Sequence, residues 1–120
     1  MRTVISGSRS ITRYDYLKYA LEHRCGWEIS KILCGDADGV DQLAQRYARE
    51  RDIELDVFEA DWENYGKAAG PRRNSEMVGR GEALVALWDG ESNGTQDTIN
   101  KALREHLTVL VCQTQPTPPF

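Results

Sequence analysis

The feature that most constrains this chain is a repeated alternation of short β-branched runs with longer stretches of apolar residues at helical spacing. The expected strands cover residues 3–5, 29–34, 54–58, 83–88 and 108–112, and the expected helices cover 15–24, 39–51, 74–79 and 93–105. Strands and helices that alternate in this way form βαβ units around a mainly parallel sheet. We therefore expect an α/β fold, a single doubly wound and mainly parallel five-stranded sheet with helices on both faces.

Length and charge narrow the classes of protein to which this chain can belong. A chain of 120 residues with 40% hydrophobic and 28% charged residues is typical of one globular domain. We expect that domain over residues 1–112 and a flexible proline-rich tail over 113–120. The net charge of −4 disfavours a protein that binds a nucleic-acid backbone. It is compatible with a local basic pocket that binds one phosphate.

The sequence contains no stretch with the composition of a membrane span or a signal peptide. No apolar run reaches the length of about 18 residues that a transmembrane helix needs. The first residues form a strand-like run that lacks the basic and apolar regions of a signal peptide. We therefore expect a cytoplasmic protein without a membrane partner.

Because Cys25, Cys34 and Cys112 are widely spaced, we expect neither a disulfide framework nor a zinc site. Strands 29–34, 83–88 and 108–112 are apolar enough to be buried on both faces.

The glycine-rich and unusually charged segments all follow the expected strands. They cover residues 6–10, 34–41, 60–74 and 89–95, so they are expected to meet at one edge of the sheet. In open α/β sheets, ligands bind beyond the carboxyl ends of the strands, near the point where the strand order reverses. The long polar stretch 59–73 has the length of a functional binding loop. One composite site built from these four segments is therefore expected.

Phosphate and ribose binding is the chemistry that these segments favour. Gly7 allows a ligand to approach the backbone closely, and Gly94 and Thr95 open a helix whose free N–H groups favour an anion. Further donors are the hydroxyl and basic side chains of Ser8, Ser10, Arg9, Lys67, Arg72 and Arg73. Acceptors for ribose hydroxyls are Asp36, Asp38 and Asp41, and the candidates to flank a base are Trp62, Tyr65 and Trp88.

Structural roles stay open as alternatives for several of these residues. Ser92 or Asn93 can cap the last helix, and Asp41 can be an acidic residue of a first helical turn. Trp62 can fill space under the long loop, and Arg73 with Asn74 can pair with an aspartate of the second segment. The full set predicted to bind ligand is Gly7, Ser8, Arg9, Gly35, Asp36, Asp38, Gly39, Asp41, Asp61, Trp62, Lys67, Arg73, Asn74, Trp88, Gly94 and Thr95. No protein metal site is expected, and Mg²⁺ that bridges a second-segment aspartate to a phosphate is the one cofactor alternative.

Five blocks of sequence in a fixed order carry a family resemblance. They are SGSR at 6–9, CGDADGVD at 34–41, ADW and YGK within 60–67, AGPRRN with the following methionine within 69–77, and ALWDG with GT within 86–95. Over residues 2 to 112 the chain resembles the YspA/YpsA-related branch of the SLOG superfamily. This resemblance implies a Rossmann-like fold, a nucleotide or nucleotide-derived ligand, and assembly into a homo-oligomer.

Relatives in that superfamily imply two further hypotheses. They include the lonely-guy phosphoribohydrolases, which carry a Gly-Gly-x-Gly-Thr-x-x-Glu motif, and the DNA-processing protein DprA. This chain has Asn93 in place of one glycine of the motif and Thr98 in place of its glutamate. The branch usually has an arginine where this chain has Asp38, so the second segment is more acidic here.

The leading hypothesis is therefore a sensor or sequestering module that binds a nucleotide-derived phosphorylated molecule at the carboxyl edge of the sheet. The alternative is a nucleotide N-glycosidase or phosphoribohydrolase, for which Asp36, Asp38, Asp61 and Arg73 are the candidate catalytic residues. A second alternative is a DprA-like DNA-binding module, which the acidic net charge disfavours.

Overall fold

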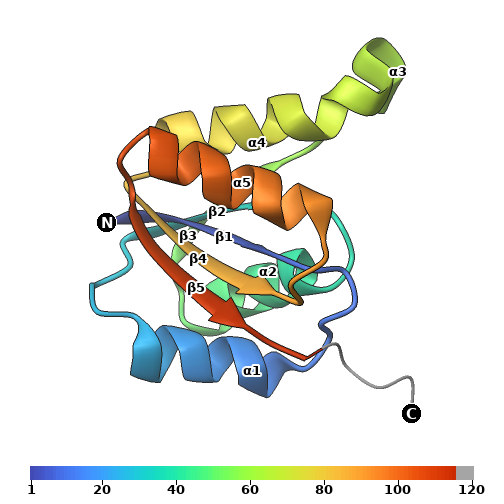
Figure 1. Ribbon diagram of the computed structural model, residues 1–120. Coiled ribbons are helices and arrows are strands. Elements are labelled where there is room, and N and C mark those ends of the chain that lie inside the picture. The colour runs from blue at the N-terminus through green and yellow to red at the C-terminus, as the bar shows by residue number, and fades with distance from the viewer. Residues whose placement is uncertain (116–120) are drawn as a thin grey trace.

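The computed structural model describes residues 1–115, and the last residues of the expected tail, 116–120, lie outside the described part. Five strands form one parallel sheet in the order β3-β2-β1-β4-β5 (Figure 1). The strands are β1 Arg2–Gly7, β2 Lys31–Gly35, β3 Glu54–Phe58, β4 Ala83–Trp88 and β5 Thr108–Gln113. The expected five-stranded parallel α/β architecture is therefore confirmed.

Helices cover both faces of the sheet. They are α1 Tyr14–Tyr19, which continues as a π-helix over Ala20–Arg24, α2 Val40–Glu50, α3 Trp62–Tyr65, a 3₁₀ turn over Gly66–Ala68, α4 Ala69–Arg80 and α5 Asn93–Arg104. Figure 1 shows α1 and α2 on one face, α4 and α5 on the other, and α3 projecting past the end of α4. Within residues 1–115, no helix is long and apolar enough to cross a membrane.

The core consists of two apolar layers that alternate along the central strands. Ile5 and Val85 pack toward α1 and α2, whereas their neighbours Val4 and Leu84 pack toward α4 and α5. All four side chains are fully buried. Because successive residues of a strand point to opposite faces, runs of β-branched and leucine residues can fill both layers at once. This packing holds the carboxyl ends of β1 and β4 side by side.

One expectation about strand burial is wrong. β2 and β4 are buried on both faces as expected, but β5 is half-exposed, and its Val111 is 38% exposed. The reason is strand order, because β5 lies at the edge of the sheet with β4 as its neighbour. The third strand that is largely buried is instead β1, which lies at the centre of the sheet between β2 and β4.

The stretch 59–73, which we expected to be a long loop, is mostly helical. Asp61 caps α3 by accepting from the backbone N–H of Asn64 at 3.3 Å, and α4 begins at Ala69 rather than near residue 74. Pro71 is the third residue of α4, where the missing N–H of proline removes no helical hydrogen bond. The early start of α4 places Arg73 and Asn74 on a rigid helix instead of a flexible loop.

Candidate functional site

A cavity of about 410 Å³ opens at the carboxyl ends of β1 and β4. The chain continues from β1 to β2 on one side, whereas β4 and β5 are added on the other side, so this is the point where the strand order reverses. The cavity brings together the predicted residues Gly7, Ser8, Arg9, Ser10, Asp41, Arg73, Asn74, Gly94 and Thr95. Segments that are distant in the sequence therefore line one cavity.

The segment after β1 is tied to the end of β4 by its backbone and by Ser8. The Ser8 N–H donates to the carbonyl of Leu87 at 3.1 Å, and the Ser8 hydroxyl accepts from the N–H of Asp89 at 3.1 Å. A Cβ atom at Gly7 would lie 2.6 Å from the same Leu87 carbonyl, so a side chain at this position would force the two strands apart. Glycine at position 7 is thus required by packing and leaves the backbone open to a ligand.

Arg9 is the basic side chain of this segment that is free to meet an anion. It is exposed at the wall of the cavity, and within residues 1–115 no ion pair holds its guanidinium group. Gly39 lies directly against the backbone of Arg9 and has a φ of +73°. A Cβ atom at Gly39 would meet the Arg9 carbonyl at 2.5 Å. Gly39 therefore packs against the backbone of the segment 6–10 and does not line the cavity.

Asp41 is a buried carboxylate at the start of α2. It is 7% exposed, and one of its oxygens accepts from the N–H of Ala37 at 3.0 Å. Burial raises the pKa of Asp41 from 3.8 to about 6, against the opposing effects of the Ala37 N–H and the Arg73 charge. A Cβ atom at Gly35 would lie 2.5 Å from Arg73 Nη1 and 2.6 Å from Asp41 Oδ2. The absence of a side chain at Gly35 thus lets the charged groups of Arg73 and Asp41 approach each other.

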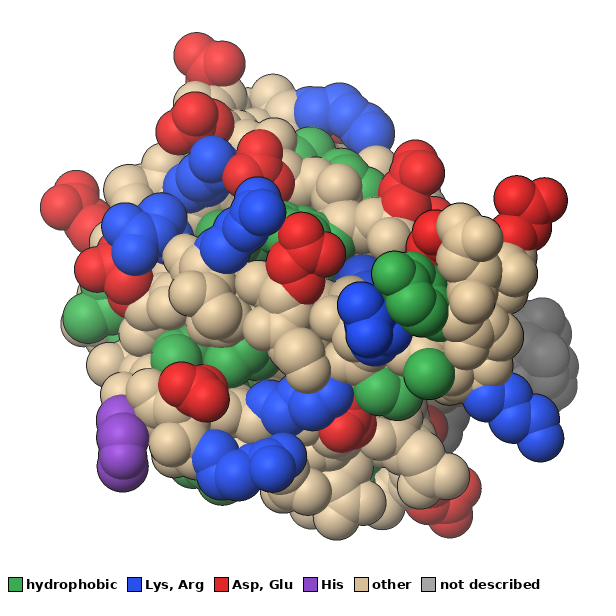
Figure 2. Space-filling model, turned by 90° about the horizontal axis from the view of Figure 1, so that it is seen from above, with side chains coloured by type: hydrophobic (Ala, Val, Ile, Leu, Met, Phe, Trp, Pro, Cys, Tyr) green, Lys and Arg blue, Asp and Glu red, His purple; other side chains and the backbone are tan. Residues whose placement is uncertain are grey.

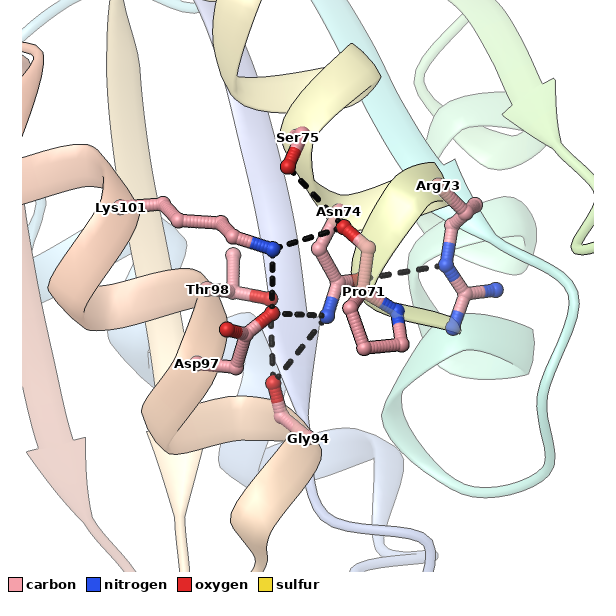
Figure 3. A network of polar contacts seen from close by, with 8 residues as sticks. All are labelled: Pro71, Arg73, Asn74, Ser75, Gly94, Asp97, Thr98 and Lys101. Atoms are coloured by element: carbon pink, nitrogen blue, oxygen red, sulfur yellow. Dashed lines mark hydrogen bonds and ion pairs between the residues drawn. The ribbon is translucent and has the colours of Figure 1, made fainter. Parts of the chain in front are cut away.

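Arg73 and Asn74 are adjacent on α4, where the Asn74 amide reaches α5 and Arg73 lies on its other side, away from α5 (Figure 3). The Arg73 side chain is 13% exposed, and its guanidinium lies toward residues 34–41, where Nη1 is 3.4 Å from Asp36 Oδ1. Arg73 Nε also donates to Asn74 Oδ1 at 3.1 Å. The Asn74 amide donates to Asp97 Oδ2 at 3.1 Å, and this oxygen also accepts from Lys101 Nζ at 2.8 Å. This network joins α4 to α5 and holds the guanidinium of Arg73 in place.

The amino end of α5 forms the opposite wall of the cavity. Ser92 caps the helix, with its hydroxyl accepting from the Thr95 N–H at 3.4 Å, which confirms the capping alternative for this residue. Asp89 accepts from the N–H groups of Glu91 and Ser92, each at 2.8 Å, and these bonds lower its pKa. Within residues 1–115, the first-turn N–H groups of Asn93 and Gly94 have no partner, so they remain available to an anion.

Other predicted residues lie outside the lining of this cavity. Asp36 and Asp38 are both exposed and do not line it. Lys67 and Trp62 are exposed on the α3 side, and Asp61 lines a neighbouring cavity. The Trp88 indole is half-buried and donates to the carbonyl of Ser92 at 3.1 Å, so it supports the turn before α5 instead of facing the cavity.

Some residues of the site were not predicted. Ser6, Ala37, Met77, Asp89 and Ser92 also line the cavity. A signal for Asp89 was present, because aspartate followed by glycine after a strand is typical of a turn in which the carboxylate accepts backbone N–H groups. Lys101 and Asp97 lie one helical turn apart in the sequence, but their contact with Asn74 depends on the packing of α4 against α5.

The position of the hydrolase glutamate is occupied by a buried threonine. Thr98 is fully buried, and its hydroxyl donates to the carbonyl of Gly94 at 3.2 Å. This side chain therefore stabilises the first turns of α5 and offers the cavity no carboxylate. Within the described residues, no group of three or more His, Cys, Asp or Glu side chains is placed to hold a metal ion.

Comparison with known proteins gives a family match and two relatives. The model of the YspA, cpYpsA-related SLOG family matches residues 1–65. The Gene 61 protein of Mycobacterium phage D29 is 34% identical over 119 residues, which cover 91% of this chain and 94% of that protein. The uncharacterized SPbeta prophage-derived protein YoqJ of Bacillus subtilis (strain 168) is 35% identical over 57 residues, 45% of this chain and 33% of that protein. No solved structure matches the chain significantly.

Proposed function

Because the chain belongs to the YspA, cpYpsA-related SLOG family, we propose that its main cavity binds a nucleotide or a nucleotide-derived phosphorylated molecule. The observation that carries the proposal is the meeting of two arginines with unpaired helix N–H groups in one cavity at the reversal of strand order. Its volume of about 410 Å³ lies in the range of small-molecule sites.

The phosphate is proposed to lie between the β1 segment and the amino end of α5. On one side, Arg9 offers a guanidinium that no ion pair occupies among the described residues. On the other side, the N–H groups of Asn93 and Gly94 point out of the first turn of α5. Arg73 lies on the wall between the phosphate and Asp36, where a bidentate contact with a phosphate oxygen pair is favourable.

A small ligand is favoured over a nucleic acid by the surface charges as well as by the cavity. Figure 2 shows basic side chains interspersed with acidic ones over the face that carries α4 and α5. Arg80 pairs with Glu76 on α4 and Lys101 pairs with Asp97 on α5, so part of the basic charge of these helices is compensated. A duplex backbone needs a coherent basic surface, and the net charge of −4 opposes one.

Binding without turnover is favoured over nucleotide hydrolysis. In the proposed arrangement the carboxylate expected of a phosphoribohydrolase is replaced by Thr98, whose hydroxyl is already engaged with Gly94. Asp41 and Asp89 are carboxyl groups that line the cavity. Asp41 is buried against Ala37 and Arg73, and Asp89 accepts from the N–H groups of Glu91 and Ser92. The module is therefore proposed to sense or sequester its ligand.

The test is binding of a panel of nucleotides, ADP-ribose and cyclic dinucleotides, measured by thermal unfolding and calorimetry, with chromatography of each mixture. A ligand at about 100 times its Kd adds roughly 2.7 kcal/mol to the free energy of unfolding. We expect Arg9→Ala to weaken binding at least tenfold, because a charge-assisted contact is lost. Arg104→Ala is the matched control, since Arg104 is also exposed and lies at the far end of α5. Equal binding by the Arg9 variant and the parent protein would refute this placement of the phosphate, and release of free base would show turnover.

A further inference from the structure

A second cavity of about 510 Å³ lies beside the first, and Arg73 lines both of them. Its walls come from the end of β3, from α3 and from the outer side of α4. The two cavities therefore share the Arg73 side chain as a common wall. For a ligand whose phosphate lies in the first cavity, the second is the neighbouring space that can take the remainder.

The second cavity is lined by charged groups of both signs. Its wall carries three carboxylates, from Glu59, Asp61 and Glu76, together with the guanidinium groups of Arg72 and Arg73. Glu59 is exposed and has no ion pair within residues 1–115, and Glu76 contacts only the exposed Arg80, at 3.3 Å. Carboxylates accept hydrogen bonds. The Glu59 and Glu76 side chains of this cavity are therefore suited to a group that carries N–H donors.

The same cavity contains an aromatic ring with a guanidinium over it. The Arg72 guanidinium lies 3.9 Å from the centre of the Tyr65 ring, and Tyr65 is 44% exposed. Trp62, on the same helix but outside the lining of this cavity, is 54% exposed. Exposed aromatic rings and guanidinium planes of this kind are suited to stacking against a planar heterocycle. A flat surface next to acceptor side chains matches a nucleobase better than it matches a sugar or a second phosphate.

We propose that the second cavity binds the base of the ligand, and that this base carries an exocyclic amino group. This inference rests on the proposed function, because it requires the phosphate to lie in the first cavity. The amino group of adenine or cytosine donates to the carboxylates of Glu59 and Glu76, whereas a keto group at the same position faces them with a carbonyl oxygen. The ligand class is thus an amino-bearing nucleotide, and nucleotides of hypoxanthine or uracil are rejected.

The test compares matched pairs of nucleotides that differ at this one group. We expect AMP to bind about tenfold tighter than IMP, or CMP about tenfold tighter than UMP, because in the keto partner a carbonyl oxygen faces the carboxylates in place of the amino donor. In the double variant Glu59→Gln, Glu76→Gln this preference is lost, since a glutamine amide also donates to a keto oxygen. The double variant Glu28→Gln, Glu105→Gln removes two exposed carboxylates elsewhere and is expected to keep the preference.

Ribose 5-phosphate separates this inference from the proposed function, because it has a phosphate and no base. Equal affinity for the amino and keto nucleotides in the parent protein would overturn the base assignment, with the phosphate site intact if ribose 5-phosphate still binds. Absence of binding by nucleotides and ribose 5-phosphate alike would overturn both proposals. The comparison in the parent protein stands by itself if the double variant does not fold.

Discussion

Replacing Asp41 by asparagine is expected to stabilise the unliganded protein at neutral pH. Asp41 is 7% exposed and has a pKa raised by burial from 3.8 to about 6, so the folded state opposes its ionisation. Between pH 4 and pH 6 the folded state holds this proton more tightly than the unfolded state does. The contribution of Asp41 to the free energy of unfolding therefore falls as the pH rises through this window and is constant above it.

The size of the effect follows from the two pKa values. They differ by a little over two, and each pKa unit corresponds to about 1.4 kcal/mol, so the ionised carboxylate costs about 3 kcal/mol at pH 7.5. At pH 4.5 the cost is only about 1 kcal/mol, because Asp41 is then largely protonated in the folded state. Asparagine has no such cost, and its amide oxygen still accepts from the N–H of Ala37, which now donates to Asp41 at 3.0 Å.

Urea unfolding of the parent protein and of Asp41→Asn over pH 4.5 to 8 measures this difference. We expect the variant to exceed the parent by about 1 kcal/mol at pH 4.5 and by about 3 kcal/mol at pH 7.5, which raises its Tm by roughly 10 °C. Asp38→Asn is the control, because Asp38 is an exposed aspartate of the same segment. A difference between variant and parent that stays constant with pH, or that is matched by the control, would refute the reasoning.

Two further substitutions, each with a control, test the packing and the hydrogen bonds around the site by urea unfolding. Gly39→Ala is expected to cost about 3 kcal/mol, because it adds a clash to an unfavourable φ of +73°. Gly66→Ala, at a φ of +51° in open space, costs only about 1 kcal/mol, and equal losses would contradict the proposed clash. Asp97→Ala is expected to cost about 1–2 kcal/mol, because it removes the acceptor shared by Asn74 and Lys101. Asp97→Asn keeps an acceptor and should recover part of that loss, so an identical loss in both variants would contradict the network.

Much of the fold could be predicted because each strand has a local signature. The β-branched runs around Val4 and Val85 indicated strands wherever they lay in the sheet. The burial of β5 could not be predicted in the same way, since it depends on which strand occupies the edge. The start of α4 was missed because Gly70 and Pro71 are typical of turns, although proline is equally suited to a first helical turn.

The position of the site was predictable for a topological reason, whereas its internal contacts were not. Parallel strands bring all the segments that follow them to one edge, so Gly7 and Gly94 were expected to meet. The roles of Ser8 and Trp88 depend on particular hydrogen bonds across the β4 end, to Asp89 and Ser92. Such bonds need the register of β1 against β4, in which Gly7 lies opposite Leu87, and no local pattern encodes that register.

The pairing of β1 with β4 also determines at which stage of folding the main cavity forms. Its walls include Ser8 and Asp89, which are 81 residues apart in the sequence, and no hairpin joins β1 to β4, because every strand pair in the sheet is parallel. Contacts of such long sequence separation form late and slowly. The main cavity is therefore absent from any intermediate that lacks the central strand pair. The amides of β1 and β4 are expected to exchange their hydrogens only through global unfolding. A ligand of this cavity is therefore expected to slow hydrogen exchange throughout β1 and β4, and not in the surrounding segments alone.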